Sequence, residues 1–330
     1  MSEVSEYPLL HSLTVFWNQI RRSLEIVRPQ RIVEIGSESG ALTERLTVWA
    51  QESQAHVVSV DPMPAASTRA LAQGSGHLLL VEAKSPWALE SVGHAEVYVI
   101  DGDHNYWTVS RELEHLFGAE AADPALAILH DVAWPWARRD LYYDPSGLPP
   151  EATHEYSFRG GVLPTDQGVS DGGFRGAGAY AYAKREGGER NGVLTAVEDA
   201  MRRRQDLELI RLPCVFGVGF LFPGSADWAD ELRQSLAPLH ELSLLDTLER
   251  NRVDLYLRLV ALQDEFERER LRVDRVISQL THTVDSLTAE NLARHPDVTQ
   301  RSIEAAAPAL RPPPSHCEAA RRRSTSRAVS

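Results

Sequence analysis

The stretch Val97-Tyr98-Val99-Ile100-Asp101-Gly102-Asp103-His104 joins a short apolar run to a polar cluster. A second stretch, Leu126-Ala127-Ile128-Leu129-His130-Asp131, repeats this arrangement. Short apolar runs that end in turn residues are typical of buried parallel strands. In open α/β sheets, ligands bind at the carboxyl ends of such strands. We therefore expect two carboxylates and up to two imidazoles to meet at one edge of a sheet.

The sequence around these stretches alternates between strand and helix patterns, which favours a Rossmann-like α/β fold with a doubly wound, mostly parallel sheet. Farther along, Pro213 separates two apolar runs, which predicts a hairpin at the sheet edge. The predicted strands are 31–35, 56–60, 77–81, 97–100, 125–129, 207–212 and 215–222, and the predicted helices are 8–27, 41–50, 67–71, 86–92, 108–117 and 192–203.

Residues 133–190 interrupt this alternation with a segment rich in Gly, Pro and aromatic residues. Long segments of this kind in a compact domain are usually lids or binding loops. Aromatic faces suit sugar rings or flat polyketide rings, although we expect most of these side chains to pack the insertion onto the sheet. We expect His154 and Arg175 to add contacts, and the glycines at 172–173, 176 and 178 to act as hinges.

The segment 239–292 has the pattern of a long helix with an apolar residue at every seventh position. This pattern predicts a coiled coil and a homo-oligomer, and the alternative is an amphipathic helix packed on its own domain. Residues 293–330 have the composition of a disordered tail. We therefore divide the chain into a globular domain at 1–237, a long helix at 238–292 and a tail. The seven-residue series comprises Leu245, Leu259, Phe266, Val273, Leu280 and Leu287, with Arg252 as its one interruption.

The bulk composition narrows the functional class. The chain has 330 residues and a net charge of -13, which disfavours nucleic acid as a partner because phosphate binding needs clustered basic residues. No apolar run approaches a membrane span, so we expect no membrane association and a cytoplasmic protein. The two cysteines, Cys214 and Cys317, argue against a disulfide framework.

A glycine-containing turn links the first predicted strand to the next helix, in Val33-Glu34-Ile35-Gly36-Ser37-Glu38-Ser39-Gly40. Glycines let the backbone approach a ligand, and the helix N-terminus offers free N–H groups. The spacing is G-x-x-x-G, not the G-x-G-x-x-G of dinucleotide-binding proteins. Glu38 in the turn would repel a pyrophosphate and favours a neutral or cationic ligand. Asp61, after the second strand, stands where a carboxylate binds both hydroxyls of a ribose.

On these motifs, residues 10–222 resemble class I S-adenosylmethionine-dependent methyltransferases. The segments that carry the resemblance are 34–40, 58–61, 100–106 and 129–132. It implies a seven-stranded sheet that ends in an antiparallel hairpin, with Gly36 and Gly40 against the methionine part of S-adenosylmethionine and Asp61 on the ribose. The cofactor site taken from the resemblance comprises Glu34, Gly36, Ser37, Gly40, Asp61 and Asp101.

Within that family, D-G-x-H and the His-Asp pair are most similar to metal-dependent O-methyltransferases that act on sugar hydroxyls of macrolide-type natural products. The resemblance implies that Asp101 and Asp131 bind Mg²⁺ and that His104 is the general base. His130 stands where the family often has an acidic ligand. Imidazole is a poorer Mg²⁺ ligand than carboxylate, so Mn²⁺ or Fe²⁺ stays open as the metal. Asp103 is a further candidate to bind the metal or to orient His104.

The residues support this chemistry by themselves. A sugar hydroxyl is a weak nucleophile, which a divalent cation activates and an imidazole deprotonates. We therefore predict an S-adenosylmethionine-dependent O-methyltransferase that acts on a hydroxylated small molecule, a sugar of a glycosylated natural product or a glycan. The alternatives are a phenol O-methyltransferase and a non-catalytic methyltransferase-like module that recruits a partner through its coiled coil. The missing dinucleotide motif disfavours an oxidoreductase.

Overall fold

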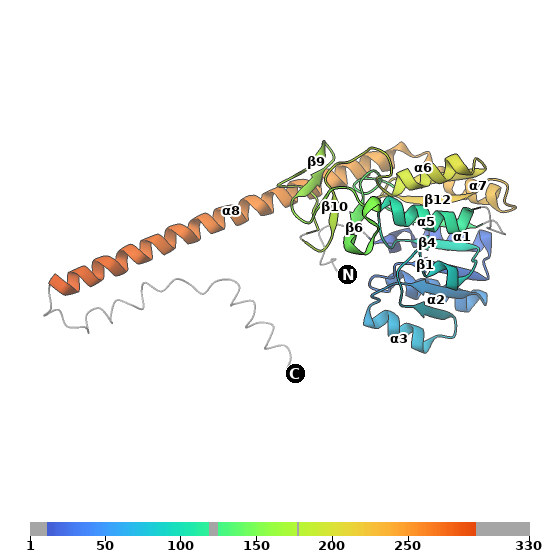
Figure 1. The fold of residues 1–330 in the computed structure, drawn as a ribbon, viewed down its shortest axis with the longest axis horizontal. Coiled ribbons are helices and arrows are strands. Elements are labelled where there is room, and N and C mark those ends of the chain that lie inside the picture. The colour runs from blue at the N-terminus through green and yellow to red at the C-terminus, as the bar shows by residue number, and fades with distance from the viewer. Residues whose placement is uncertain (1–11, 119–124, 177, 295–330) are drawn as a thin grey trace. The chain divides into compact units, whose positions relative to one another are not determined.

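The computed structural model describes residues 12–118, 125–176 and 178–294 of the chain (Figure 1). Seven strands form its central sheet, in the order β11-β12-β5-β4-β1-β2-β3. The first five along the chain are parallel, and β12 runs antiparallel to both β5 and β11. The predicted fold class and its edge hairpin are thereby confirmed. The strands are β1 (Arg31–Ile35), β2 (His56–Val60), β3 (Leu78–Val81), β4 (Val97–Ile100), β5 (Leu126–His130), β11 (Leu207–Leu212) and β12 (Val218–Pro223).

Helices cover both faces of this sheet. One apolar layer lies between the sheet and α1, α2 and α7, and the other lies between the sheet and α4, α5 and α6. Every residue of β4 is buried, with Val97 and Val99 in the first layer and Tyr98 and Ile100 in the second. This explains the unbroken apolar run in the sequence. The helices are α1 (Trp17–Val27), α2 (Ala41–Ser53), α3 (Ala66–Gly74), α4 (Leu89–Val92), α5 (Tyr106–Phe117), α6 (Val193–Arg203) and α7 (Ala229–His240).

Several predicted boundaries are wrong for local reasons. The strand predicted to start at Val215 starts at Val218, because Val215, Phe216 and Gly217 have φ angles of 51°, 63° and 86°, which a strand does not allow. Helix α7, whose buried residues include Leu232 and Leu236, was not predicted from the sequence. The predicted helix 8–27 is a 3-10 turn at Leu13–Phe16 followed by α1, and residues 8–11 lie outside the described ranges.

The insertion at 133–190 has a folded core of its own. A three-stranded sheet, in the order β6-β10-β7, lies beside the hairpin β8–β9. The Arg139 side chain is fully buried and donates to the backbone carbonyls of Ala183 and Gln167 at 2.6 and 2.8 Å. The Arg139 side chain therefore connects separate segments of the insertion to one another. Its elements are β6 (Leu141–Tyr142), β7 (Tyr156–Ser157), β8 (Gly161–Leu163), β9 (Asp166–Ser170), β10 (Ala181–Ala183) and the 3-10 turns Pro145–Gly147 and Pro150–Ala152.

A single long helix, α8 (Ser243–Arg294), follows α7. It starts later than predicted, because residues 239 and 240 close α7, and it extends two residues into the predicted tail. The chain divides into two compact units after Asp264, so Ser243–Asp264 belongs with the sheet and the rest of α8 with the second unit. Residues 295–330, with Cys317, lie outside the described ranges. Among the helices described, none has the length and apolar character to cross a membrane.

Candidate active site

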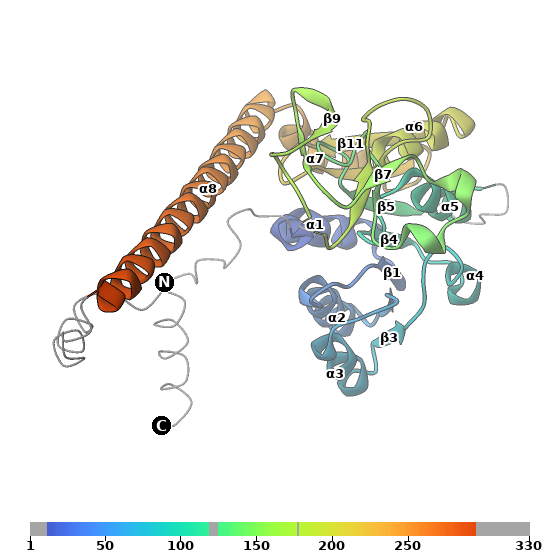
Figure 2. The ribbon, with the colours of Figure 1, turned by 60° about the vertical axis from the view of Figure 1, so that its left-hand side comes forward.

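The carboxyl ends of β4 and β5 bring the predicted chemical groups together. Figure 2 shows β5, β4 and β1 as neighbours in the sheet, in accordance with their pairing. His130 Nδ1 lies 3.0 Å from Asp101 Oδ1 and 3.6 Å from Asp131 Oδ2. His104 Nδ1 lies 3.1 Å from the same Asp131 oxygen. The two imidazoles and two carboxylates thus meet at one edge of the sheet, where the sequence predicts them.

His104 and Asp131 form an oriented pair. With Nδ1 donating to Asp131, the neutral imidazole keeps a lone pair on Nε2, which is the arrangement of a general base. Asp131 has a φ of 61°, a left-handed conformation that Asp tolerates better than most residues. Asp103, the other candidate to bind the metal or to orient His104, accepts a hydrogen bond from Asn105 Nδ2 at 2.7 Å. Asp131 is the orienting group.

His130 uses both ring nitrogens. Its Nε2 donates to the carbonyl of Val215 at 2.8 Å, and its Nδ1 faces Asp101. Burial by itself would lower the pKa of His130, but the charges of Asp101 and Asp131 outweigh burial and raise the pKa to about 10. Without a metal, His130 is therefore a cation between two carboxylates. A metal would need the lone pair of Nδ1, so a metal and a proton compete for this atom.

The donor set at this edge fits a divalent cation. Ligand atoms of Asp101, His130 and Asp131 all lie within 4.8 Å of one another. Asp131 Oδ1 is buried and has no hydrogen-bond partner. A buried carboxylate oxygen without a partner is costly, and a cation would satisfy it. One imidazole with two carboxylates is a donor set that suits Mn²⁺ or Fe²⁺ at least as well as Mg²⁺.

The turn between β11 and β12 has a strained backbone and provides the Val215 carbonyl that accepts a hydrogen bond from His130. Val215 and Phe216 have positive φ angles, which are unfavourable for a β-branched or bulky residue. The Phe216 N–H donates to Glu249 Oε1 of α8 at 3.1 Å, and the Phe216 carbonyl accepts from the Ala133 N–H at 2.7 Å. These bonds hold the Val215 carbonyl on His130. No pattern in the sequence indicates this role.

The glycine turn is shaped by neighbouring protein atoms. A Cβ on Gly36, whose φ is 86°, would lie 2.3 Å from the backbone oxygen of Asp101, and a Cβ on Gly40 would lie 2.4 Å from Thr68 Oγ1. Ser37 donates to Asp61 Oδ2 through its N–H and its hydroxyl, both at 2.8 Å. Close packing against neighbouring protein atoms therefore requires glycine at both positions, whether or not a ligand binds at the turn. Asp61 ties this turn to the end of β2.

Glu34 lies in the interior, beneath the turn. Its side chain accepts from Thr43 Oγ1 and Ser59 Oγ at 2.7 Å each, and the residue is 1% exposed. Burial raises the pKa of Glu34 to about 7, although these two hydrogen bonds oppose the rise. Of the predicted cofactor-binding residues, this one is turned away from the surface.

A cavity of about 400 Å³ opens above the cluster of imidazoles and carboxylates. This size is in the range of small-molecule sites. Asp101, His104, His130 and Asp131 line part of it, and we call them the floor. The aromatic side chains that line the rest form the wall: Trp136, Tyr143, Phe174, Tyr180, Phe216 and Tyr256. The first four of these lie in the insertion whose aromatic residues were predicted to contact the acceptor or to pack on the sheet. Phe216 and Tyr256 come from the edge hairpin and from α8 and were not predicted.

Residues 33–132, which include all four floor residues, match a family model described as a methyltransferase domain. The chain carries a methyltransferase domain. This finding confirms the predicted enzyme class. No curated protein matches the sequence significantly.

Solved structures of methyltransferases resemble this one at low identity. The methyltransferase PaMTH1 of Podospora anserina is 13% identical, with 65% of this chain and 79% of that chain covered and a TM-score of 0.39. A putative caffeoyl-CoA O-methyltransferase of Staphylococcus aureus is 13% identical over 68% and 88% of the two chains, with a TM-score of 0.37. A putative O-methyltransferase of Klebsiella pneumoniae is 15% identical over 64% and 80%, with a TM-score of 0.36. These similarities do not assign an acceptor to the methyltransferase domain.

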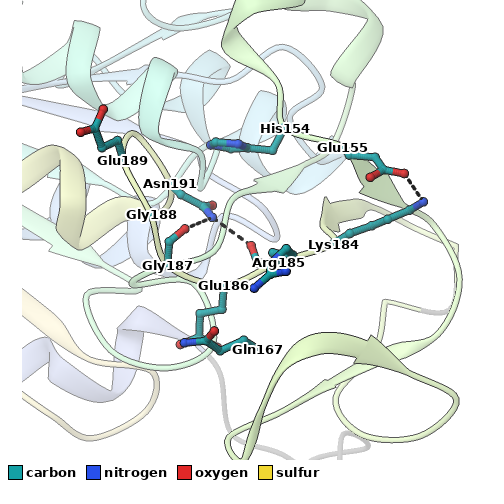
Figure 3. A pocket seen from close by; sticks show the side chains of 10 residues that line it. All are labelled: His154, Glu155, Gln167, Lys184, Arg185, Glu186, Gly187, Gly188, Glu189 and Asn191. Carbon is teal, nitrogen blue, oxygen red and sulfur yellow. Dashed lines mark hydrogen bonds and ion pairs between the residues drawn. The ribbon is translucent and has the colours of Figure 1, made fainter.

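A second hollow lies within the insertion and contains none of the floor residues (Figure 3). His154 lines this hollow, and its Nε2 lies 2.9 Å from the carbonyl oxygen of Arg190. The expectation that His154 contacts the acceptor is therefore not met in this structure, because the side chain lies outside the cavity above the floor. Arg175, the other polar residue predicted to do so, does line that cavity.

Proposed function

We propose that the protein transfers the methyl group of S-adenosylmethionine to a hydroxyl of a small molecule, a sugar of a glycosylated natural product or of a glycan. The observation that carries the proposal is the oriented His104–Asp131 pair on the floor of an aromatic cavity, beside the glycine turn. An aromatic wall above a polar floor suits a sugar ring, which has an apolar face and a polar edge.

The glycine turn and Asp61 are the proposed cofactor site. Asp61 accepts three hydrogen bonds, from Ser37 twice and from the Met63 N–H at 2.7 Å. A carboxylate has about four acceptor sites, so Asp61 retains capacity for a ribose hydroxyl. Glu38, which lines the cavity, places negative charge close to this turn. That charge suits a sulfonium better than a pyrophosphate.

His104 is the proposed general base. Its Nε2 takes the proton of the acceptor hydroxyl while the oxygen attacks the methyl carbon and the sulfonium leaves as a thioether. Asp131 holds the Nδ1–H and stabilises the imidazolium that forms. The wall holds the acceptor in line with the methyl group, and such positioning supplies much of the rate in a displacement.

Asp101, His130 and Asp131 are the proposed ligands of a divalent cation. Such a cation, when bound, lowers the pKa of a hydroxyl and fixes its position. His130 would bind through Nδ1, since Nε2 donates to the Val215 carbonyl. We expect the protein freed of metal by EDTA to lose turnover and to regain it with Mg²⁺ or Mn²⁺. Full turnover of the metal-free protein would contradict the metal site but not the base.

The decisive experiment is mass spectrometry of products. The full chain is incubated with S-adenosylmethionine, a divalent metal and a panel of glycosides and phenols. We expect a product heavier by one CH₂ from at least one glycoside, with no such product from His104→Ala. Methylation of phenols alone would favour the phenol O-methyltransferase alternative. Failure with every acceptor, together with no binding of S-adenosylmethionine, would contradict the proposal.

We also infer that the second unit of α8 pairs with the same segment of another copy. Phe266, Leu280 and Leu287 are 74%, 60% and 60% exposed and continue the seven-residue series. Large apolar side chains in a row on one helix are unfavourable in water, and pairing of two such helices removes them from it. A second seven-residue series on α8 contains Leu248, Leu255, Leu262 and Val276. The exposed residues Glu269 and Thr283 interrupt it, which limits the expected stability of the pair.

A further inference from the structure

The part of α8 that belongs to the first unit, Ser243–Asp264, packs one of its faces on the methyltransferase domain. Val253 and Val260 are both 6% exposed, and Tyr256 lies between them at helical spacing, where it lines the cavity. Leu255 and Leu259 are 55% and 40% exposed. This part of the helix is thus amphipathic and packed on its own domain, and Tyr256 is on the packed face.

The Tyr256 ring joins an aromatic series that starts at the floor. Ring contacts with centroid separations of 5.8 to 6.1 Å link His104 to Tyr143, Tyr180, Trp136, Phe174 and Tyr256 in turn. Every ring in this series lines the cavity. His104 and Tyr256 are its two ends. Four other rings of the wall lie between them along the series, so Tyr256 is available to a part of the ligand other than the hydroxyl at His104.

An ion pair fixes this end of the wall. Arg175 follows Phe174 in the insertion, and its guanidinium binds both carboxylate oxygens of Asp264 on α8, with Nη1–Oδ2 at 3.0 Å. Bidentate pairs between Arg and carboxylate have a fixed geometry, so this contact sets both position and orientation. Phe174 of the insertion contacts Tyr256 of α8, so the ion pair between Arg175 and Asp264 keeps these two rings together.

We propose that Tyr256 is a specificity-determining residue that binds the part of the acceptor that is not methylated, and that Asp264 is a positioning residue for this wall. The ligand class is a glycoside with a flat, apolar aglycone, because Tyr256 and Phe174 offer ring faces and edges in the cavity wall, whereas Tyr143 is the ring beside the base. This inference rests on the proposed function, since the base defines which end of the acceptor reacts.

The test compares two glucosides that differ in the aglycone. The full chain, saturated with S-adenosylhomocysteine to prevent turnover, is titrated by calorimetry with 4-nitrophenyl β-D-glucoside and with methyl β-D-glucoside. We expect the wild type to prefer the aromatic glucoside. Tyr256→Ala should weaken its binding between about twofold and tenfold, the scale of one aromatic contact, and should leave methyl glucoside unaffected. Leu255→Ala, an exposed neighbour on the same helix, is the matched control and should change neither.

Equal affinity of the wild type for the two glucosides, including no measurable binding of either, would overturn the inference. So would an unchanged preference in Tyr256→Ala. Binding requires no methyl transfer, so a protein that shows the expected preference but yields no methylated product would contradict the proposed function and leave the role of Tyr256 intact. A protein that yields a methylated glycoside but shows no preference between the two glucosides would support the proposed function and contradict the role of Tyr256.

The positioning role of Asp264 is tested with one variant that removes its charge and one that keeps it. Asp264→Asn should weaken 4-nitrophenyl β-D-glucoside about threefold or more with kcat unchanged, because the base and the cofactor turn are untouched, and Asp264→Glu should restore binding. Asp254→Asn, at an exposed position of the same helix, is the control. Unchanged binding in Asp264→Asn would overturn the positioning role, and so would a parallel loss of kcat that Asp264→Glu does not reverse.

Discussion

The floor and the wall of the cavity differ in how they are built. The floor consists of two imidazoles and two carboxylates at the carboxyl ends of two neighbouring strands, and each of them has a partner within the floor. The wall consists of rings from three separate segments: the insertion, the edge hairpin and α8. Under the proposed function, the strand ends would carry out the chemistry, and the surfaces contributed by the rest of the chain would select the acceptor.

The largest expected effect is at the floor. His104→Ala should lower kcat by about 10²–10⁴-fold, the usual loss when a general base is removed, while the affinity for S-adenosylmethionine stays unchanged. His154→Ala, outside the cavity, is the control. Steady-state kinetics and calorimetry measure the two quantities. If His104→Ala retains near wild-type kcat between pH 6 and 9, the base lies elsewhere, with His130 as the next candidate.

The second prediction concerns the stability cost of Glu34, the buried acid beneath the glycine turn. Because the pKa of Glu34 is raised to about 7, the folded state holds a proton that the unfolded state loses near pH 4.5. The unfolding free energy should therefore fall by up to about 3 kcal/mol from this residue as the pH rises from about 4.5 to about 7. Urea unfolding across this range should show that Glu34→Gln removes most of this slope. A slope that is the same in both proteins would contradict the assignment.

The third prediction separates the cofactor turn from the wall. Asp61→Ala should weaken S-adenosylmethionine binding by about 1–3 kcal/mol, the scale of hydrogen bonds to a charged group. The preference between the two glucosides should persist, since Asp61 does not line the cavity. Calorimetry gives both values. Unaltered cofactor affinity, or tight binding of NAD instead, would remove Asp61 and the glycine turn from the proposed cofactor site.

The smallest expected effect on chemistry comes from the second unit of α8. Leu280→Glu in the full chain should abolish self-association in light scattering and leave kcat and glucoside binding unchanged, because no described residue of this unit lines the cavity. Glu269→Gln, on the same segment, serves as a control that keeps the apolar series. A wild type that is monomeric at all concentrations would contradict pairing.

Arg252 shows why sequence and structure gave different views of α8. In the sequence it is a flaw in a seven-residue apolar series. In the structure its guanidinium lies over the Phe216 ring at 5.0 Å and pairs with Glu249, so the residue suits packing on the domain. The first unit of α8 follows the amphipathic alternative, whereas the second retains the exposed series. The amphipathic alternative therefore describes Ser243–Asp264, and pairing of the rest of the helix stays a prediction.

The sequence by itself determined the sheet and the floor. Strand ends are local features: an apolar run fixes the strand, and the next residue is at the edge, so Asp101, His104, His130 and Asp131 were predictable as a group. The tertiary structure alone decided the partners within that group and the membership of the wall. Asp131, not Asp103, orients His104, and Tyr256 reaches the cavity, because both depend on where distant segments pack. Local periodicity carries no information about such packing.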